Sequence, residues 1–139
     1  MKIERRKFFE WDKTTQMQLK RATLPGGYLK HFIRLFPESP TIVVFEQKRI
    51  KGWAFAFFHE GTTDLFLFVH RQYRRQGVAT LLITEAMKDF PTIMLAKWNG
   101  VTARFFQKMH RTHPSKVQVY DWWKSLSRYS KLLQLTPAS

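Results

Sequence analysis

The sequence predicts an α/β fold, in which a single domain holds a mixed, mostly antiparallel sheet flanked by helices. Three observations lead to this prediction. Two strand-like runs, 41–46 and 50–59, are joined by a short polar turn, as in a β-hairpin. A third apolar run, 64–69, passes through a basic turn into a helical pattern over 77–89, and a further run follows at 92–97. A strand, a helix and a strand in this order predict a right-handed crossover between parallel strands.

The other elements fit one compact domain of 139 residues, 16% of them aromatic and able to fill a core. Further strands are expected at 3–11 and 116–122, and further helices from a cap within 12–15 to about residue 22, at 28–35 and at 101–109. Gly52 indicates a bulge or a close approach at the start of its strand. We expect a domain over 1–122 and a helical tail over 123–139 that packs on the domain or on a partner.

The basic turn between the third run and its helix has the features of an anion site. The first amides of a helix lack partners within the helix and lie at the positive end of its dipole. Gly77 permits a positive φ and a close approach to the backbone, and Ala79 keeps the helix start open. Arg71, Arg74 and Arg75 add positive charge. The spacing predicts a phosphate-binding turn that is not a Walker A loop, and the alternative is a tight turn with solvated arginines.

The pattern Arg74-x-x-Gly77-x-Ala79, after a strand and before a leucine-rich helix, resembles motif A of the GCN5-related N-acetyltransferase (GNAT) superfamily. Asn99 opens a segment, ending in an aromatic pair and Lys108, that is similar to motif B. The resemblance implies an enzyme, an acetyl-CoA-dependent N-acetyltransferase, that acetylates an amine of unknown identity by direct attack in a ternary complex. It also implies that strands four and five splay apart, with the pantetheine arm of the co-substrate between them.

The same resemblance assigns roles to individual residues. The implied acetyl-CoA-binding residues are Leu67, Phe68, Val69, Arg74, Arg75, Gln76, Gly77, Val78, Ala79, Thr80, Asn99, Phe106 and Lys108. Tyr28, His31 and Arg34 are implied to contact the acceptor. Two alternatives remain open: an amphipathic helix that packs its aromatic face is favoured for Tyr28 over contact with the acceptor, and Asn99 is equally expected to cap the helix that follows it.

The catalytic positions depart from the family pattern. Phe106 stands where many members carry a tyrosine that protonates the sulfur of CoA. The glutamate that many members use as a base at the start of strand four is also missing, because Thr63 stands at that position. Asp64, Glu60 and His59 are the candidates for the base, and Tyr120 is a candidate for the acid. The three candidate bases are alternatively ordinary residues at the end of a strand, and a water molecule is the alternative to Tyr120.

Charge and composition limit the partners. Twenty-four Lys and Arg against ten Asp and Glu give a formal net charge of +14, more than the three phosphates of CoA require. This excess favours a nucleic acid or an acidic protein surface as a further partner. The alternatives are a charge that serves solubility alone, and a nucleic-acid-binding protein with a GNAT-like fold and no catalysis.

Other classes of site are not expected. The chain has no cysteine, so disulfides and thiolate metal sites are excluded, and His110 and His113 lack a third ligand for a metal. No apolar run has the length of a membrane span, and the first residues do not resemble a signal peptide. We therefore expect a cytoplasmic protein that does not bind membranes, either a monomer or a homodimer.

Overall fold

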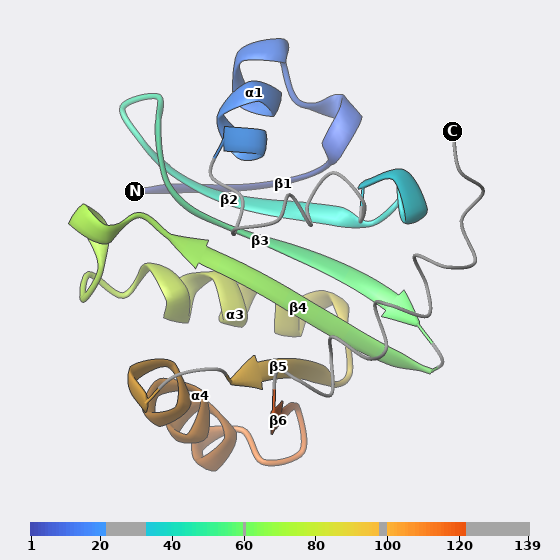
Figure 1. Cartoon of the computed structure of the whole chain (residues 1–139), viewed down its shortest axis with the longest axis vertical. Coiled ribbons are helices and arrows are strands. Elements are labelled where there is room, and N and C mark those ends of the chain that lie inside the picture. The colour runs from blue at the N-terminus through green and yellow to red at the C-terminus, as the bar shows by residue number, and fades with distance from the viewer. Residues whose placement is uncertain (22–32, 60, 98–99, 122–139) are drawn as a thin grey trace.

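The computed structural model describes residues 1–21, 33–59, 61–97 and 100–121, and Figure 1 shows their arrangement. A six-stranded sheet in the order β1-β2-β3-β4-β5-β6 runs through the molecule. Its strands are β1 (Lys2–Lys7), β2 (Pro40–Glu46), β3 (Arg49–His59), β4 (Thr62–Val69), β5 (Ile93–Lys97) and β6 (Val117–Asp121). The helices are α1 (Lys13–Arg21), α3 (Val78–Asp89) and α4 (Gly100–Thr112), with short 3-10 helices η1 (Phe8–Glu10) and η2 (Arg71–Tyr73).

The strand directions confirm the predicted sheet. Strands β1 to β4 are antiparallel neighbours, whereas β4 pairs with β5, and β5 with β6, in parallel. The ends of β2 to β6 agree with the prediction to within two residues. Two boundaries differ. β1 ends at Lys7 because the chain turns through η1, where Glu10 Oε1 accepts a hydrogen bond from Lys7 N (2.8 Å), and α4 continues to Thr112. The predicted tail, 123–139, and most of the predicted helix 28–35 lie outside the described residues.

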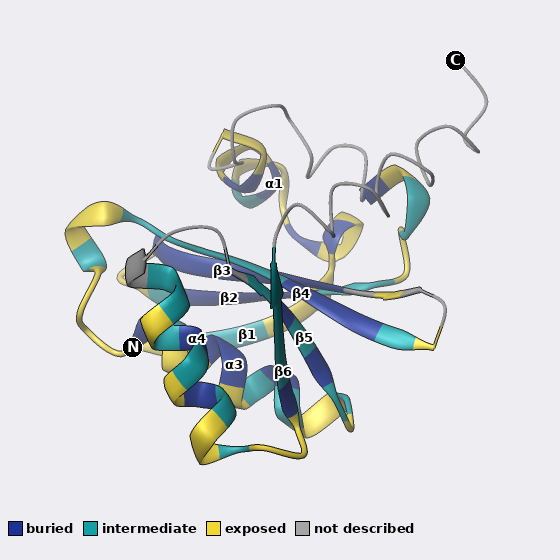
Figure 2. Cartoon of the chain, turned by 60° about the horizontal axis from the view of Figure 1, so that its bottom comes forward, coloured by how far each residue is buried: buried dark blue, intermediate teal, exposed yellow. Residues whose placement is uncertain are grey.

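Strand β3 lies in the middle of the core and is apolar on both faces, as predicted. Ala54 and Ala56 belong to a cluster that includes buried residues of α3 and α4, while Trp53 and Phe55 belong to a second cluster with α1. Figure 2 shows α3 and α4 on one side of the sheet and α1 on the other. The sheet is therefore covered on both faces around β3 and β4.

Gly52 explains how α3 approaches the sheet so closely. A Cβ atom at this position would lie 2.8 Å from Phe68 O and 2.9 Å from Val78 Cγ1, so only glycine lets the start of α3 pack here. The register shifts beside it, since Val44 pairs with Gly52 but Phe45 pairs with Ile50. The residue between them, Lys51, is thus the extra residue of a β-bulge.

Strands β4 and β5 splay apart, as the family resemblance implies. β4 pairs with β3 along its whole length, from Thr62 to Val69. Its parallel pairing with β5, in contrast, is recorded at one position in the described chain, Asp64 opposite Met94. The carboxyl half of β4 therefore keeps an unpaired edge on the side of β5.

Two further findings concern the described part of the chain. None of its helices combines the length and the apolar character that crossing a membrane requires. Within the same residues, no three His, Asp or Glu side chains come together as a metal site would need.

Candidate active site

The loop between β4 and α3, residues 70–77, is compact and begins with η2. Tyr73 N donates a hydrogen bond to His70 O (2.8 Å). The chain then takes the left-handed conformation twice, at Arg75 (φ 66°) and at Gly77 (φ 78°), before α3 begins. Gly77 is the N-cap of α3, and its positive φ is a conformation that favours glycine over every other residue. The predicted strand, basic turn and helix are confirmed, with the glycine at the junction.

The first turn of α3 presents amide groups without partners in the helix. The first helical hydrogen bond runs from Leu81 N to Gly77 O (3.0 Å), and no side chain caps the helix. The N–H groups of Val78, Ala79 and Thr80 are therefore available to a ligand. A Cβ at Gly77 would meet nothing within 4 Å, and the first turn contains no acidic residue. Space, amide donors and the positive end of the helix dipole thus suit an anion.

The unpaired edge of β4 leads directly to this turn. His70 N donates to Lys51 O (3.0 Å) across to β3, whereas Val69 O accepts a hydrogen bond from Arg74 Nε (3.3 Å) on the other edge. Successive residues of a strand direct their backbone groups to opposite edges. Leu67 and Val69 therefore point their backbone groups into the gap between β4 and β5, where an extended ligand can pair with them.

A buried lysine fastens the loop to the sheet. The exposed fraction of Lys51 is 4%. Its Nζ donates to Gln76 Oε1 (2.9 Å), pairs with Glu46 Oε2 (2.6 Å) and lies 5.0 Å from the centroid of the Tyr73 ring. Through Gln76 and Tyr73 this one ammonium group holds two separate parts of the loop.

The Lys51 ammonium also determines the ionisation of Glu46 and the orientation of the Gln76 amide. The hydrogen bond from Lys51, and then its charge, lowers the pKa of Glu46 below the ordinary value, so Glu46 stays ionised in weak acid. A lysine ammonium only donates hydrogen bonds, so it engages the oxygen of the Gln76 amide and leaves both Nε2 hydrogens for another acceptor. The sequence analysis missed Lys51, although a lysine beside a glycine within an apolar strand was a usable signal.

Two of the predicted catalytic residues meet at the other end of β4. The Tyr120 hydroxyl, on β6, donates a hydrogen bond to Asp64 Oδ1 (2.8 Å), and Asp64 is only 1% exposed. Asp64 sits at the point where β4 and β5 pair, and Tyr120 lies opposite Ala96 of β5. The pair is thus held where the gap between the splayed strands closes. From Asp64 to Val69 the strand extends about 17 Å at the usual rise per residue.

Comparison with known proteins decides the family. The family model of the acetyltransferase (GNAT) domain matches residues 37–110, more than half of the chain. A search of the curated proteins with this chain gave no match. The chain belongs to the GNAT acetyltransferase family. It is accordingly an acetyl-CoA-dependent N-acetyltransferase, an acyltransferase whose amine acceptor is not determined.

Solved structures share the GNAT fold at low sequence identity. The aminoglycoside 6'-N-acetyltransferase AAC(6')-Ig from Acinetobacter haemolyticus is 16% identical, with a TM-score of 0.55 over 81% of this chain and 88% of that one. Aminoglycoside N-acetyltransferase AAC(6')-Iy, in complex with CoA, is 16% identical, with a TM-score of 0.54 over 80% and 88%. A ribosomal-protein-alanine N-acetyltransferase from Brucella melitensis biovar Abortus is 10% identical, with a TM-score of 0.51 over 78% and 91%.

Within this GNAT fold, the side chains of three predicted cofactor-binding residues are buried in the core or pack against it. The Phe68 ring stacks on Trp53, with centroids 6.2 Å apart. Val78 is 1% exposed and Phe106 is 7% exposed, and both belong to the cluster under α3 and α4. The buried side chains of Val78 and Phe106 are therefore not accessible to a ligand. Phe106 has no hydroxyl to donate a proton, and its ring is buried.

The other predicted residues lie on the surface or outside the described chain. The exposed ones are Arg34, Arg74, Arg75, Gln76, Gly77, Thr80 and Lys108, and the half-buried ones are Leu67, Val69 and Ala79. Tyr28, His31, Glu60 and Asn99 fall outside the described residues, so their predicted roles remain predictions. Lys108 lies one helical turn beyond Arg104 on α4.

Proposed function

We propose that the first turn of α3 and the β4–α3 loop bind the diphosphate of acetyl-CoA. The amides of Val78, Ala79 and Thr80 supply hydrogen-bond donors, and the dipole of α3 supplies positive potential. The open space at Gly77 and the absence of acidic residues in the first turn fit a diphosphate. The observation that carries the proposal is the glycine-capped helix at the end of a splayed strand in a chain of this family.

The loop adds side chains to these amides. Gln76 keeps its Nε2 hydrogens for a phosphate oxygen because Lys51 occupies its Oε1. Arg75 is exposed and contributes a guanidinium, the group best suited to phosphate geometry. Arg74 bonds Val69 O and so stays close to the end of β4, where it adds charge beside the diphosphate.

The splayed edge of β4 is proposed to align the rest of the co-substrate. Backbone groups of Leu67 and Val69 hydrogen-bond the amides of the pantetheine arm, in the way that a further strand would. The arm then runs along β4 toward the Asp64–Tyr120 pair. When bound, acetyl-CoA supplies an activated acetyl thioester for direct attack by the amine. The protein contributes orientation and backbone N–H groups that stabilise negative charge on the carbonyl oxygen.

The Asp64–Tyr120 pair is proposed to move the proton. Asp64 accepts a proton from the attacking amine, directly or through a water molecule. Once protonated, its carboxyl donates a hydrogen bond to the Tyr120 oxygen instead of accepting one. The Tyr120 hydroxyl hydrogen is then free to pass to the leaving sulfur, and Tyr120 takes the proton that Asp64 holds. One proton thus travels from amine to sulfur, and Tyr120 replaces the tyrosine that is absent at position 106.

The acceptor is proposed to be an amine that is not itself a polycation. The enzymes of similar fold are named for aminoglycosides and for ribosomal-protein alanine. A formal net charge of +14 repels a polycationic antibiotic at long range and attracts an amine carried by an anionic partner. Of the three residues predicted to contact the acceptor, Arg34 lies within the described residues, where it is exposed in the segment before β2.

The proposal is tested by thermal unfolding with and without acetyl-CoA. A ligand at 100 times its Kd stabilises the folded state by about 2.7 kcal/mol, so the melting temperature is expected to rise clearly. Pantetheine, which lacks the diphosphate and the phosphorylated adenosine of CoA, should raise the melting temperature far less. No rise with millimolar acetyl-CoA, or an equal rise with pantetheine, would contradict binding at the loop.

A further inference from the structure

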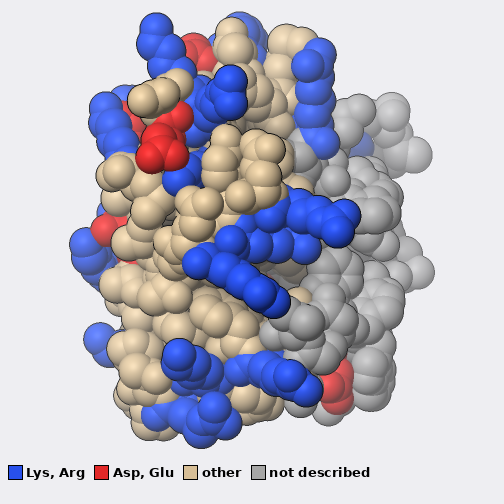
Figure 3. Space-filling view, turned by 90° about the vertical axis from the view of Figure 1, so that its left-hand side faces the viewer, with Lys and Arg blue, Asp and Glu red and all other residues tan. Residues whose placement is uncertain are grey.

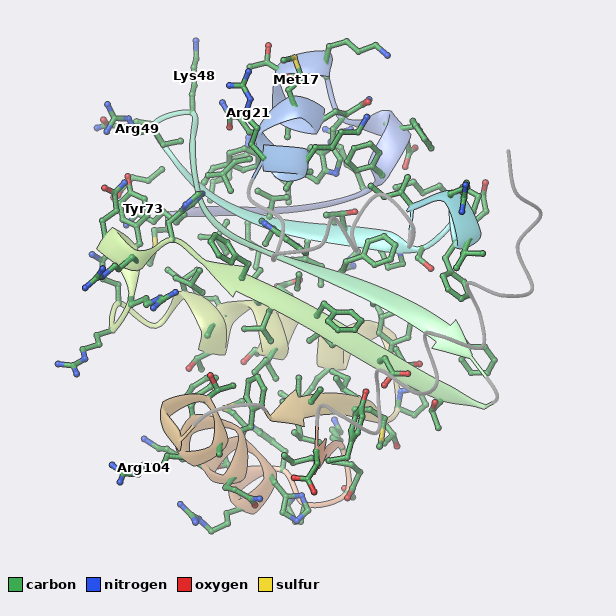
Figure 4. All side chains as sticks on the ribbon, viewed as in Figure 1. Met17, Arg21, Lys48, Arg49, Tyr73 and Arg104 are labelled. Carbon is green, nitrogen blue, oxygen red and sulfur yellow. The ribbon has the colours of Figure 1, made fainter. Side chains whose placement is uncertain are left out.

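We propose that the face around the β4–α3 loop also docks a nucleic acid through its phosphate backbone. We call it the basic face and define it by Lys48, Arg49, Arg71, Arg75 and Arg104. Figure 3 shows this side of the molecule, where Lys and Arg predominate over Asp and Glu. In Figure 4, Arg49 and Arg104 project outward on the same side, with Tyr73 of the loop between them. The inference goes beyond acetyl transfer and does not depend on it.

The ion pairs found within the described chain neutralise cations elsewhere. Carboxylates pair with Lys2, Arg5, Lys7 and Lys88, and Arg5 binds both acidic residues of the last two turns of α3. Glu46, the carboxylate next to the β2–β3 turn, is engaged by the buried Lys51. By contrast, none of the five residues that define the basic face has an ion pair with any described residue. Their positive charge is therefore left for a partner.

The backbone holds two of these cations, Lys48 and Arg75, in a left-handed conformation that their side chains disfavour. Gln47 and Lys48 both have positive φ, 50° and 70°, at the tip of the β2–β3 hairpin. Such hairpin turns strongly prefer asparagine and glycine, which adopt positive φ readily. Here a lysine occupies the second turn position and an arginine follows it. Backbone strain retained at an exposed charge points to a role in binding.

Charge and composition favour a nucleic acid over an acidic protein. The diphosphate site accounts for Arg74 and Arg75. The cations that remain around it are Lys48 and Arg49 of the β2–β3 hairpin, Arg71 of η2 and Arg104 of α4. Interfaces with proteins bury an apolar centre, whereas interfaces with nucleic acids are polar and strongly positive. The exposed large apolar side chains of the described chain are Met1, Phe9, Met17, Phe58 and Leu81, and none lies in the β2–β3 turn, the β4–α3 loop or α4.

The test measures binding of a fluorescently labelled 20-base-pair DNA duplex and of an RNA hairpin at several salt concentrations. The face variant carries Lys48→Gln, Arg49→Gln and Arg104→Gln. The matched control carries Lys13→Gln, Lys88→Gln and Lys116→Gln, which removes the same charge from exposed positions outside the β2–β3 turn, the β4–α3 loop and α4. Each phosphate contact contributes about 0.9 to the slope of log K against log salt. We expect the face variant to lower that slope by about 2 to 3 and the control to leave it unchanged.

A second variant separates binding from folding. Lys48→Gly relieves the positive φ and removes the charge, so we expect the melting temperature to rise while duplex affinity falls. Equal losses in the face variant and the control would show that net charge alone attracts the duplex and would overturn the proposal. So would a tighter complex with a polyglutamate peptide than with either nucleic acid, which would assign the face to a protein. The rise in melting temperature with acetyl-CoA, measured in parallel, reports the proposed enzyme site separately.

Discussion

Replacing Lys51 with methionine removes the ammonium group that holds the β4–α3 loop and keeps a flexible apolar side chain of similar length. The loss frees Gln76 Oε1 and the Tyr73 ring, so the loop is no longer fixed before the co-substrate binds. A hydrogen bond from a charged donor contributes about 1.5–3 kcal/mol. Exposed Gln76 replaces part of the lost hydrogen-bond energy by bonding to water, so we use the lower limit, about 1.5 kcal/mol, as the loss of binding free energy. This loss predicts that the Kd for acetyl-CoA rises about tenfold.

Stability should respond much less than affinity. Lys51 is 4% exposed, and replacing a buried charged group by an apolar one of similar volume is often neutral or stabilising, because the cost of desolvating the charge disappears. Glu46 is half exposed and is hydrated when its partner is lost. We therefore expect the melting temperature of the free enzyme to change by only a few degrees. Isothermal titration calorimetry with acetyl-CoA and thermal unfolding measure the two effects separately.

Two controls define the result that would refute this reasoning. Lys7→Met breaks the ion pair with Glu38, far from the loop in the sheet order, and should leave the Kd for acetyl-CoA unchanged. If Lys51 acts through Gln76, the double variant Lys51→Met with Gln76→Met should bind little worse than Gln76→Met alone. A Kd unchanged by Lys51→Met, or fully additive losses in the double variant, would refute the positioning role.

Three further predictions concern the proposed binding and proton-transfer residues. Gly77→Glu places a carboxylate at a positive φ in the anion site and should abolish the acetyl-CoA-dependent rise in melting temperature, whereas Gly77→Asn, which tolerates this φ, should retain most of it. Tyr120→Phe should lower kcat by 10²–10³ with little change in KM for acetyl-CoA, measured by thiol release; an unchanged kcat would exclude Tyr120 as the acid. Because the pKa of Glu46 is lowered in the folded enzyme, its contribution to stability is present above the unfolded value of about 4.3 and is lost as the pH falls through the lower folded value. Urea unfolding of the wild type and Glu46→Gln should therefore differ near neutral pH and converge in stronger acid.

The sequence predicted those parts of the fold that depend on local patterns. The apolar runs and the glycine at position 77 predicted β4, α3 and the turn between them, because strand and helix periods and a required positive φ are local properties. The place of Gly52 at the start of a strand indicated a bulge or a close approach, and the structure has a close approach at Gly52 with a bulge beside it. Long-range contacts were not predictable in this way. Lys51 finds Gln76 only because β3 and β4 pair in one particular register.

The Asp64–Tyr120 hydrogen bond shows the same limit. Both residues were separate candidates in the sequence, 56 positions apart, and their meeting depends on the parallel placement of β6 beside β5. A motif read from the residues also does not reveal which side chains pack inward. Phe106 matched a family position, yet amphipathic packing of α4 places its ring in the core.

The most direct test of the account is a titration of the ¹⁵N-labelled enzyme with CoA, followed by amide resonances. If the glycine-capped helix and the splayed strand hold the co-substrate, the amide signals of Gly77, Val78, Ala79 and Thr80 should shift most, together with that of Val69. Amides of α1, on the opposite face of the sheet from α3 (Figure 2), and of β1, at the edge of the sheet, should stay unchanged. Shifts centred elsewhere, with these amides unaffected, would contradict the binding site on which the account depends.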